Sequence, residues 1–82
     1  MEFVVIKATG TTVDPYFEKN ANACIKYNIP FYVYHFMSKD DDRAKFFYDT
    51  ASKFTPLGYV LDVEGDALNA NTYSTTSAFV AT

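Results

Sequence analysis

Residues 31–37, FYVYHFM, decide the fold of this chain. The run has little polar content on either face, which is typical of a strand in a parallel sheet that is covered on both sides. The runs at 3–6 (FVVI) and 59–64 (YVLDVE) have the same apolar character until their last residues. We therefore expect three strands, near residues 2–9, 30–37 and 59–64.

The segments between these runs each predict a helix. Asp14 as N-cap and Pro15 in the first helical position predict where the first helix begins, and Asn28 predicts where it ends. Apolar residues at helical spacing give this helix a predicted buried stripe of Phe17, Ala21, Cys24 and Ile25. The predicted stripe of the second helix consists of Ala44, Phe47, Tyr48, Ala51 and Phe54. Residues 74–82 are compatible with the start of a third helix.

Three consecutive aspartates, residues 40–42, precede the second predicted helix. Negative charge near a helix N-terminus is favoured by the helix dipole. We therefore interpret this run as solvated capping residues and expect no metal ion there.

The order strand, helix, strand, helix, strand predicts an α/β fold in which right-handed crossovers make the three strands parallel. With 82 residues, the chain supports at most one small domain. Its net charge of −3 gives no basic surface for nucleic acid, and no apolar run approaches the ~20 residues of a membrane span. We expect neither partner. Cys24, the single cysteine, cannot form an intrachain disulfide and is expected to be buried and inert.

Polar and ionisable residues follow the apolar part of each strand: Lys7 in the first, Tyr34 and His35 in the second, Asp62 and Glu64 in the third. The carboxyl ends of parallel strands lie along one edge, where α/β folds build their sites. Burying an ionisable group costs several kcal/mol unless it is paired. These residues therefore predict either a functional site or a buried lysine–carboxylate pair.

Asp62 and Glu64, at i and i+2 of a strand, point to the same face with their Cα atoms ~6.5 Å apart. Repulsion between two carboxylates raises one pKa, which gives a proton donor beside a group that stays ionised. Glycosidic bond cleavage requires this pair of states. Alternation puts His35 on the opposite strand face from Tyr34 and Phe36. We interpret His35 as a hydrogen-bonded structural residue rather than a base, and the sequence leaves open which face lines the site.

Several segments of the chain resemble glycoside hydrolase family 25, the Chalaropsis-type lysozymes of bacteria, fungi and phage endolysins. They are residues 3–9 with 11–17 and Asn20, residues 28–30 with 34–36, residues 46–47, and residues 59–64. The similarity runs from about Phe3 to Glu64 and corresponds to the family's second, third and fourth strands. It implies that residues 1–82 are a partial catalytic domain, an incomplete βαβαβ segment of a TIM-like (β/α) barrel.

The resemblance implies a hydrolase, an N-acetylmuramidase that cleaves the β-1,4 bond between N-acetylmuramic acid and N-acetylglucosamine of peptidoglycan with retention. Glu64 would be the general acid and base, and Asp62 would stabilise the substrate's own N-acetyl group as it attacks. Lys7 would line the groove, and Tyr34 with Phe36 would form an aromatic wall. No metal or organic cofactor is implied. The protein would act after secretion, in the cell wall, or after release at phage lysis, although this segment shows no signal peptide.

Two features depart from the family pattern. The family usually has a Glu between the residues that match Thr9 and Gly10, and its first strand carries a further essential Asp that this chain lacks, as it lacks strands five to eight. We therefore expect the chain alone to be inactive and either to self-associate or to require the rest of a barrel. The alternative is a non-catalytic cell-wall-binding or self-assembling α/β module. A chitinase-like enzyme is disfavoured because Val60 stands where its preceding acid would be.

Overall fold

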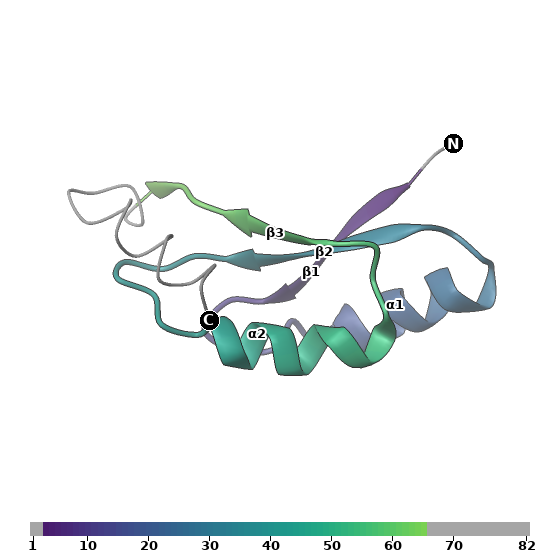
Figure 1. The fold of residues 1–82 in the computed structure, drawn as a ribbon, viewed down its shortest axis with the longest axis horizontal. Helices are drawn as coiled ribbons and strands as arrows, with labels where there is room; N and C mark the ends of the chain where they lie inside the picture. Colours follow the sequence, from purple (N-terminus) through teal and green to yellow (C-terminus); the bar gives the residue numbers. More distant parts are fainter. Residues whose placement is uncertain (1–2, 66–82) are drawn as a thin grey trace.

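The computed structural model describes residues 3–65, which form a parallel three-stranded sheet with helices on one side (Figure 1). In chain order the elements are β1 (Val4–Thr9), α1 (Phe17–Lys26), β2 (Phe31–Phe36), α2 (Ala44–Ala51), the short 3-10 helix η1 (Ser52–Phe54) and β3 (Tyr59–Asp62). The predicted α/β class and the parallel pairing are confirmed. The third helix expected from residue 74 lies outside the described residues.

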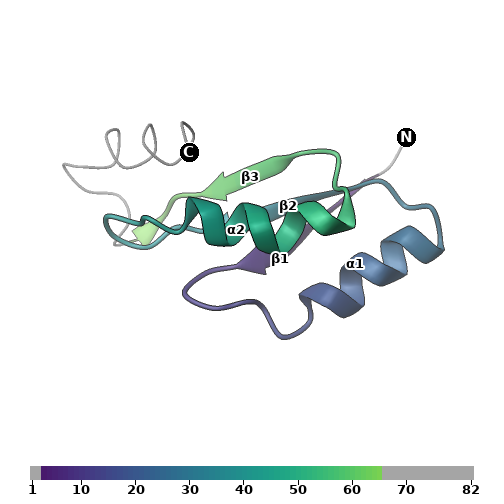
Figure 2. The ribbon, with the colours of Figure 1, turned by 60° about the horizontal axis from the view of Figure 1, so that its bottom comes forward.

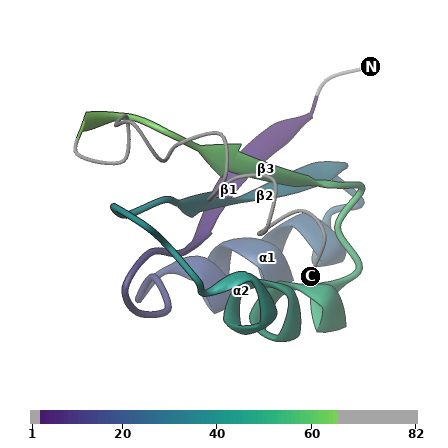
Figure 3. The same cartoon turned by 60° about the vertical axis from the view of Figure 1, so that its left-hand side comes forward.

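Both helices lie on the same side of the sheet, and the other side carries no helix in the part of the chain that is described (Figures 2 and 3). The strand order β1-β2-β3 explains this arrangement. Two consecutive crossovers of the same hand, each joining neighbouring parallel strands, place their helices on the same face. Neither helix between residues 3 and 65 has the length and apolar character needed to cross a membrane.

The central strand β2 separates two environments. Phe31, Val33 and His35 point towards the helices and are buried, whereas Tyr32 and Tyr34 are half-buried and Phe36 is exposed. The sequence left open which of these faces lines a site; in the structure Tyr34 and Phe36 lie on the side without helices. We call this uncovered side the open face; pairing, alternation and ring contacts give it Phe3, Val5, Lys7, Tyr32, Tyr34, Phe36, Val60 and Asp62. Glu64, two residues beyond the end of β3, joins it through its hydrogen bond with Asp62.

The buried side of each helix is narrower than predicted. Phe17, Ala21 and Cys24 of α1 and Ala44, Phe47 and Ala51 of α2 are buried against the sheet, as expected. Ile25 is wrong as a core residue, because it lies at the edge of the α1 stripe and is 48% exposed. Tyr48 is also wrong, at 57% exposed, because its ring packs on Tyr59 at the open edge of β3. Phe54 is partly buried against Phe17.

Helix α1 begins at Phe17, two residues later than Pro15, which was expected at the first helical position. The reason is a turn that Asp14 closes. Its Oδ1 accepts a hydrogen bond from the N–H of Tyr16 at 2.9 Å, and its carbonyl accepts one from the N–H of Phe17 at 3.0 Å. Asp14 thus organises the approach to the helix but does not cap it directly.

The end of α1 confirms the prediction made from Asn28. This residue has a φ of 55°, in the left-handed region. Its N–H donates to the carbonyl of Ile25 at 3.3 Å, and the N–H of Ile29 donates to the carbonyl of Cys24 at 2.8 Å. These two bonds form a Schellman motif, which satisfies the last carbonyls of the helix and turns the chain towards β2.

The left-handed conformation of Asn28 yields a test of this helix end. Asn28→Val should lower the free energy of unfolding by about 1–2 kcal/mol, since a branched side chain is strained at positive φ. Asn28→Gly should leave the free energy unchanged or slightly raised, because glycine adopts this φ without strain. Urea unfolding of the three proteins measures the difference. Equal losses for valine and glycine would contradict the assignment.

Candidate functional site

Polar groups from all three strands meet at the carboxyl edge of the open face. Lys7 pairs with Tyr34 across β1 and β2, and Phe36 pairs with Asp62 across β2 and β3. The Nζ atom of Lys7 lies over the ring of Phe36, 5.5 Å from its centroid. Phe36 therefore stands between a cation on one side and a carboxylate on the other.

Asp62 and Glu64 share the open face at the end of β3. Leu61 and Val63, which alternate with them, turn to the helix side and pack against the core. When it is protonated, the Glu64 carboxyl donates a hydrogen bond to the Asp62 carboxylate, and this bond together with the charge of Asp62 raises the pKa of Glu64 above its ordinary value. The expected rise in one pKa therefore falls on Glu64, which keeps a proton to higher pH than a lone glutamate would.

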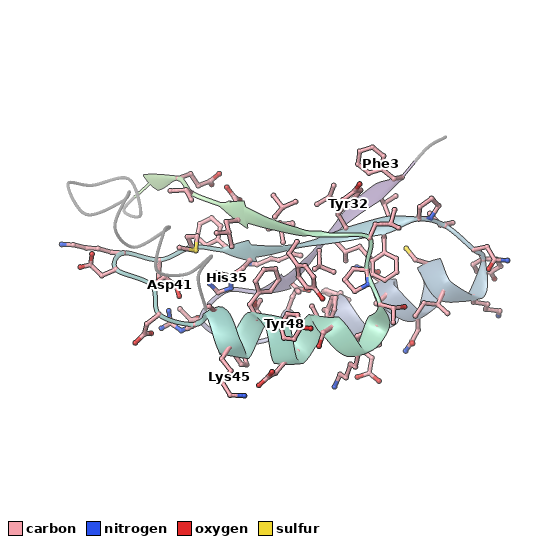
Figure 4. All side chains as sticks on the ribbon, viewed as in Figure 1. Phe3, Tyr32, His35, Asp41, Lys45 and Tyr48 are labelled. Atoms are coloured by element: carbon pink, nitrogen blue, oxygen red, sulfur yellow. The ribbon has the colours of Figure 1, made fainter. Side chains whose placement is uncertain are left out.

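An apolar aromatic surface continues from this edge along the open face. The rings of Phe3 and Tyr32 meet edge to face with centroids 5.3 Å apart, on the side of the sheet away from the helices (Figure 4). A Cβ added to Gly58 would lie 2.9 Å from the Tyr32 ring, so glycine lets β3 begin close to that ring. Aromatic faces beside a few polar groups suit a ligand with both apolar faces and hydroxyl edges.

His35 does not belong to the open face. It is fully buried between the sheet and α2, where its ring stacks on Phe47 with centroids 5.3 Å apart. Its Nδ1 lies 2.7 Å from Thr9 Oγ1, and its Nε2 lies 2.8 Å from Asp41 Oδ2. This geometry favours the structural interpretation of His35, since the ring points away from Asp62 and Glu64.

The interpretation of residues 40–42 as solvated capping residues is wrong for Asp41, which is only 5% exposed. Its carboxylate accepts hydrogen bonds from the N–H and hydroxyl of Ser38 and from the N–H of Arg43. Burial alone would raise the pKa of Asp41, but these donors and His35 outweigh it and hold the pKa below its ordinary value. A buried histidine six residues earlier was the one sequence signal that an acid partner was needed.

No group of three or more His, Cys, Asp or Glu side chains that could hold a metal ion occurs among residues 3–65. Cys24 is buried in α1, and burial raises the pKa of its thiol, as expected of an inert cysteine.

The carboxylate pair gives a prediction about proton affinity. Asp62→Asn should lower the pKa of Glu64 towards that of an isolated glutamate, because it removes the neighbouring negative charge. A carbon-13 NMR titration of the glutamate carboxyl groups measures the shift. Asp49→Asn, on the exposed side of α2, serves as the control and should leave Glu64 unchanged. An unaltered Glu64 titration in Asp62→Asn would show that the two carboxyls do not interact.

The buried Asp41 gives a prediction about acid stability. Because its folded pKa is lowered, its contribution to stability is present above the unfolded pKa of about 3.9 and is lost as pH falls through the folded value. Asp41→Asn should remove this acid dependence and cost about 3–5 kcal/mol near neutral pH, since it weakens several hydrogen bonds to one buried carboxylate and removes its ion pair with Arg43. The matched Asp49→Asn breaks only the exposed pair with Lys45 and should cost less than about 1 kcal/mol. Urea unfolding across pH measures both, and similar losses would refute the special role of Asp41.

Comparison with known proteins adds one finding to this geometry. The family model of glycosyl hydrolases family 25 matches residues 1–82, so the match includes every residue at the carboxyl edge of the open face. Neither the comparison with curated proteins nor the comparison with solved structures gave a match.

Proposed function

The chain belongs to glycosyl hydrolases family 25, and from that premise we propose that it is part of a lysozyme, an N-acetylmuramidase of bacterial peptidoglycan. The bond cleaved would be the β-1,4 bond between N-acetylmuramic acid and N-acetylglucosamine. The observation that carries the proposal is the carboxyl pair Asp62 and Glu64, set on an uncovered aromatic face with the pKa of Glu64 raised.

Glu64 is proposed as the proton donor. Its raised pKa keeps the carboxyl protonated over part of the acidic range, which a general acid requires. The proton would pass to the glycosidic oxygen as the bond from that oxygen to the anomeric carbon breaks. The resulting Glu64 carboxylate would then take a proton from the water that attacks the anomeric carbon, which restores the acid for the next cycle.

Asp62 is proposed as the group that supports the substrate's own nucleophile. In a substrate-assisted route, the carbonyl oxygen of the N-acetyl group attacks the anomeric carbon and a positive charge develops on the acetamido group. A carboxylate at i−2 on the same strand face is placed to accept the acetamido N–H and to stabilise that charge. Two successive inversions at one carbon give overall retention.

Lys7, Tyr34 and Phe36 are proposed to bind the glycan. Phe36 is 39% exposed and lies beside Asp62 in the neighbouring strand, so its ring offers a flat apolar surface for the face of a sugar. Lys7, held over that ring, can donate hydrogen bonds to hydroxyl or carboxyl groups of the glycan. The partner is thus the peptidoglycan strand, and no metal or organic cofactor enters the proposed reaction.

The three strands are proposed to form one wall of a (β/α) barrel. Within residues 3–65, the strands are parallel neighbours in chain order, the helices lie on one side of the sheet, and polar groups lie at the carboxyl ends of the strands; all three features suit this architecture. The open face would then be the barrel interior. Since hydrolysis needs the opposite wall and a closed barrel takes on the order of 200 residues or more, we propose that the 82-residue chain by itself does not turn over substrate.

The site of action follows from the substrate. Peptidoglycan lies in the cell wall, so the protein would act there, either after secretion or after release at phage-induced lysis. A second candidate function is a non-catalytic cell-wall-binding or self-assembling module. The exposed apolar residues of the open face favour it, among them Phe3, Val5 and Val60.

A transition-state analogue separates these functions without requiring turnover. A thiazoline analogue of the muramic acid unit imitates the cyclised N-acetyl group that a substrate-assisted site stabilises. We expect the chain to bind it at least about 100-fold more tightly than the unmodified disaccharide, and Asp62→Asn to lose the preference. Isothermal titration with both ligands measures this, and Lys45→Ala, on the exposed side of α2, is the control.

The outcomes are distinct. Equal affinity for both ligands would favour the non-catalytic module, and binding of neither would contradict the proposal. Release of new reducing ends from purified peptidoglycan is measured in parallel for the unmodified chain and Glu64→Gln, and no difference is expected. A Glu64-dependent release would support the muramidase and refute the proposed inactivity. Light scattering on the same samples tests self-association, which a stable monomer would exclude.

A further inference from the structure

The strongest feature outside the carboxylate site is a buried chain of hydrogen bonds through Thr9, His35 and Asp41. We propose that His35 is a positioning residue that fixes the ends of β1 and β2 and thereby holds Lys7 and Phe36 at the candidate site. The proposal deepens the function argued above and rests on it only in treating Lys7 and Phe36 as site residues.

The first step is a β-bulge in β1. Lys7 pairs with Tyr34 and Thr9 pairs with His35, so Ala8 is an extra residue with no partner of its own. In a regular strand, Thr9 would share the face of Lys7 and point to the open side. The bulge turns Thr9 to the helix side, where it is fully buried. Bulges re-aim side chains in this way and are common beside functional sites.

The second step is the bond that holds the bulge. Thr9 Oγ1 lies 2.7 Å from His35 Nδ1, and no buried side-chain polar atom between residues 3 and 65 lacks a hydrogen-bond partner. The loop that follows returns to the bulge, because the N–H of Asp14 donates to the carbonyl of Ala8 at 2.8 Å. The Thr9–His35 contact therefore ties the bulge and its loop to the central strand.

The third step is the tie from His35 to the loop between β2 and α2. His35 and Asp41 lie next to each other (Figure 4), with His35 Nε2 2.8 Å from Asp41 Oδ2. The N–H of Ser38 donates to the same oxygen at 2.9 Å. On the other side of this segment, the N–H of Met37 donates to the carbonyl of Asp62 at 2.9 Å. The chain just after Phe36 is thus held on two sides, by β3 through the Met37–Asp62 bond and by Asp41 through the Ser38 bond. The position of Asp41 in turn depends on its bond with His35.

The hydrogen-bond partners of His35 show which of its two ring nitrogens carries a proton. The Asp41 carboxylate accepts hydrogen bonds from the N–H groups of Ser38 and Arg43 and can only accept from His35, so Nε2 carries a proton. Arg43, 3.5 Å from Asp41 Oδ2, already supplies one positive charge to this buried group. In the neutral form of the ring with Nε2 protonated, Nδ1 accepts the hydroxyl proton of Thr9.

The order hydroxyl, imidazole, carboxylate resembles a nucleophilic relay, but the geometry excludes that role here. Thr9 and His35 are fully buried, and both lie on the helix side of the sheet. A glycan on the open face would be separated from the Thr9 hydroxyl by the sheet itself. Holding the two strand ends in register is the role that remains.

The consequence at the site is geometric. Lys7 is the last residue of β1 on the open face before the bulge, and Gly10 follows the bulge, where an added Cβ would lie 3.7 Å from Phe36 Cβ. The bulge and the Phe36 segment are therefore packed together, and the position of Lys7 over the Phe36 ring depends on both. Loss of the Thr9–His35 bond should move Lys7 relative to that ring.

Proton NMR of the 82-residue chain tests this directly, since the Phe36 ring current shifts the ε-methylene signals of Lys7. In Thr9→Val, which keeps the side-chain shape without the hydroxyl, this ring-current shift should be largely lost. Amide exchange at Asp14 should rise about five- to tenfold, the factor for one hydrogen bond of ordinary strength. The amide of Asn20 in α1 serves as the reference. Its exchange rate should change only by the factor expected from any change in the global free energy of unfolding.

Two variants serve as controls. Thr9→Ser retains a hydroxyl and should keep the Lys7 shift. Ala21→Gly destabilises α1 by about 1 kcal/mol without touching the bulge, and should also keep it. A Lys7 shift that is unmoved in Thr9→Val, or equally lost in Ala21→Gly, would overturn the proposal, because a purely structural role would then explain the data.

Two further measurements cover the case in which Thr9→Val does not fold. His35→Gln keeps an amide donor for Asp41 but removes the Nδ1 acceptor, and should displace the Lys7 signals in the same way; unmoved signals would refute the proposal. Nitrogen-15 spectra of the unmodified chain should show Nε2 of His35 protonated, and the opposite tautomer would overturn the assignment. No glycan is present in any arm, so failure here leaves the proposed muramidase standing, and absence of glycan binding leaves this result unchanged.

Discussion

Side chains of β2 alternate between two faces of the sheet, and the rest of the structure depends on the helices covering only one of them. Because β2 is central and pairs on both sides, its register decides which residues of the other strands join each face. Lys7 stands beside Tyr34, and Asp62 stands beside Phe36, all on the open face. A slip of one residue would exchange the two faces, bury Asp62 under α2 and expose His35.

The same strand ends therefore carry ionisable groups in two different environments. On the helix side of the sheet, Asp41 is buried with His35, and every buried side-chain polar atom among residues 3–65 has a hydrogen-bond partner. On the open face, Glu64 is exposed, so water screens its interaction with Asp62. Excluding water from this face, by a bound glycan or by further walls, would strengthen the interaction and raise the pKa of Glu64 more. The helix side thus supplies rigidity, and the open face supplies a pair of acids whose properties depend on what covers them.

Local sequence patterns predicted the elements, and long-range contacts decided most of what they missed. The three apolar runs, the stop at Asn28 and the shared face of Asp62 and Glu64 follow from periodicity and from single-residue conformational preferences. The buried Asp41 does not, since its burial goes with a contact to His35, which the sheet and α2 bury and which no local sequence pattern shows. The bulge at Ala8 is also invisible in sequence, because a strand pattern contains no sign of which residue its neighbour leaves unpaired.

The bulge at Ala8 lies where the sequence departs from the family pattern, at Thr9 and Gly10. In the pattern that the chain resembles, a glutamate stands between these positions and would add a side chain at the mouth of the open face. Here Thr9 turns to the helix side and Gly10 is buried against Phe36 and Lys7. Gly10 thus lies close to Phe36, and Lys7 is the ionisable group of β1 on the open face. The charge of Lys7 is opposite in sign to that of the missing glutamate, so in the proposed site this corner of the open face would favour anionic or acceptor groups of a glycan.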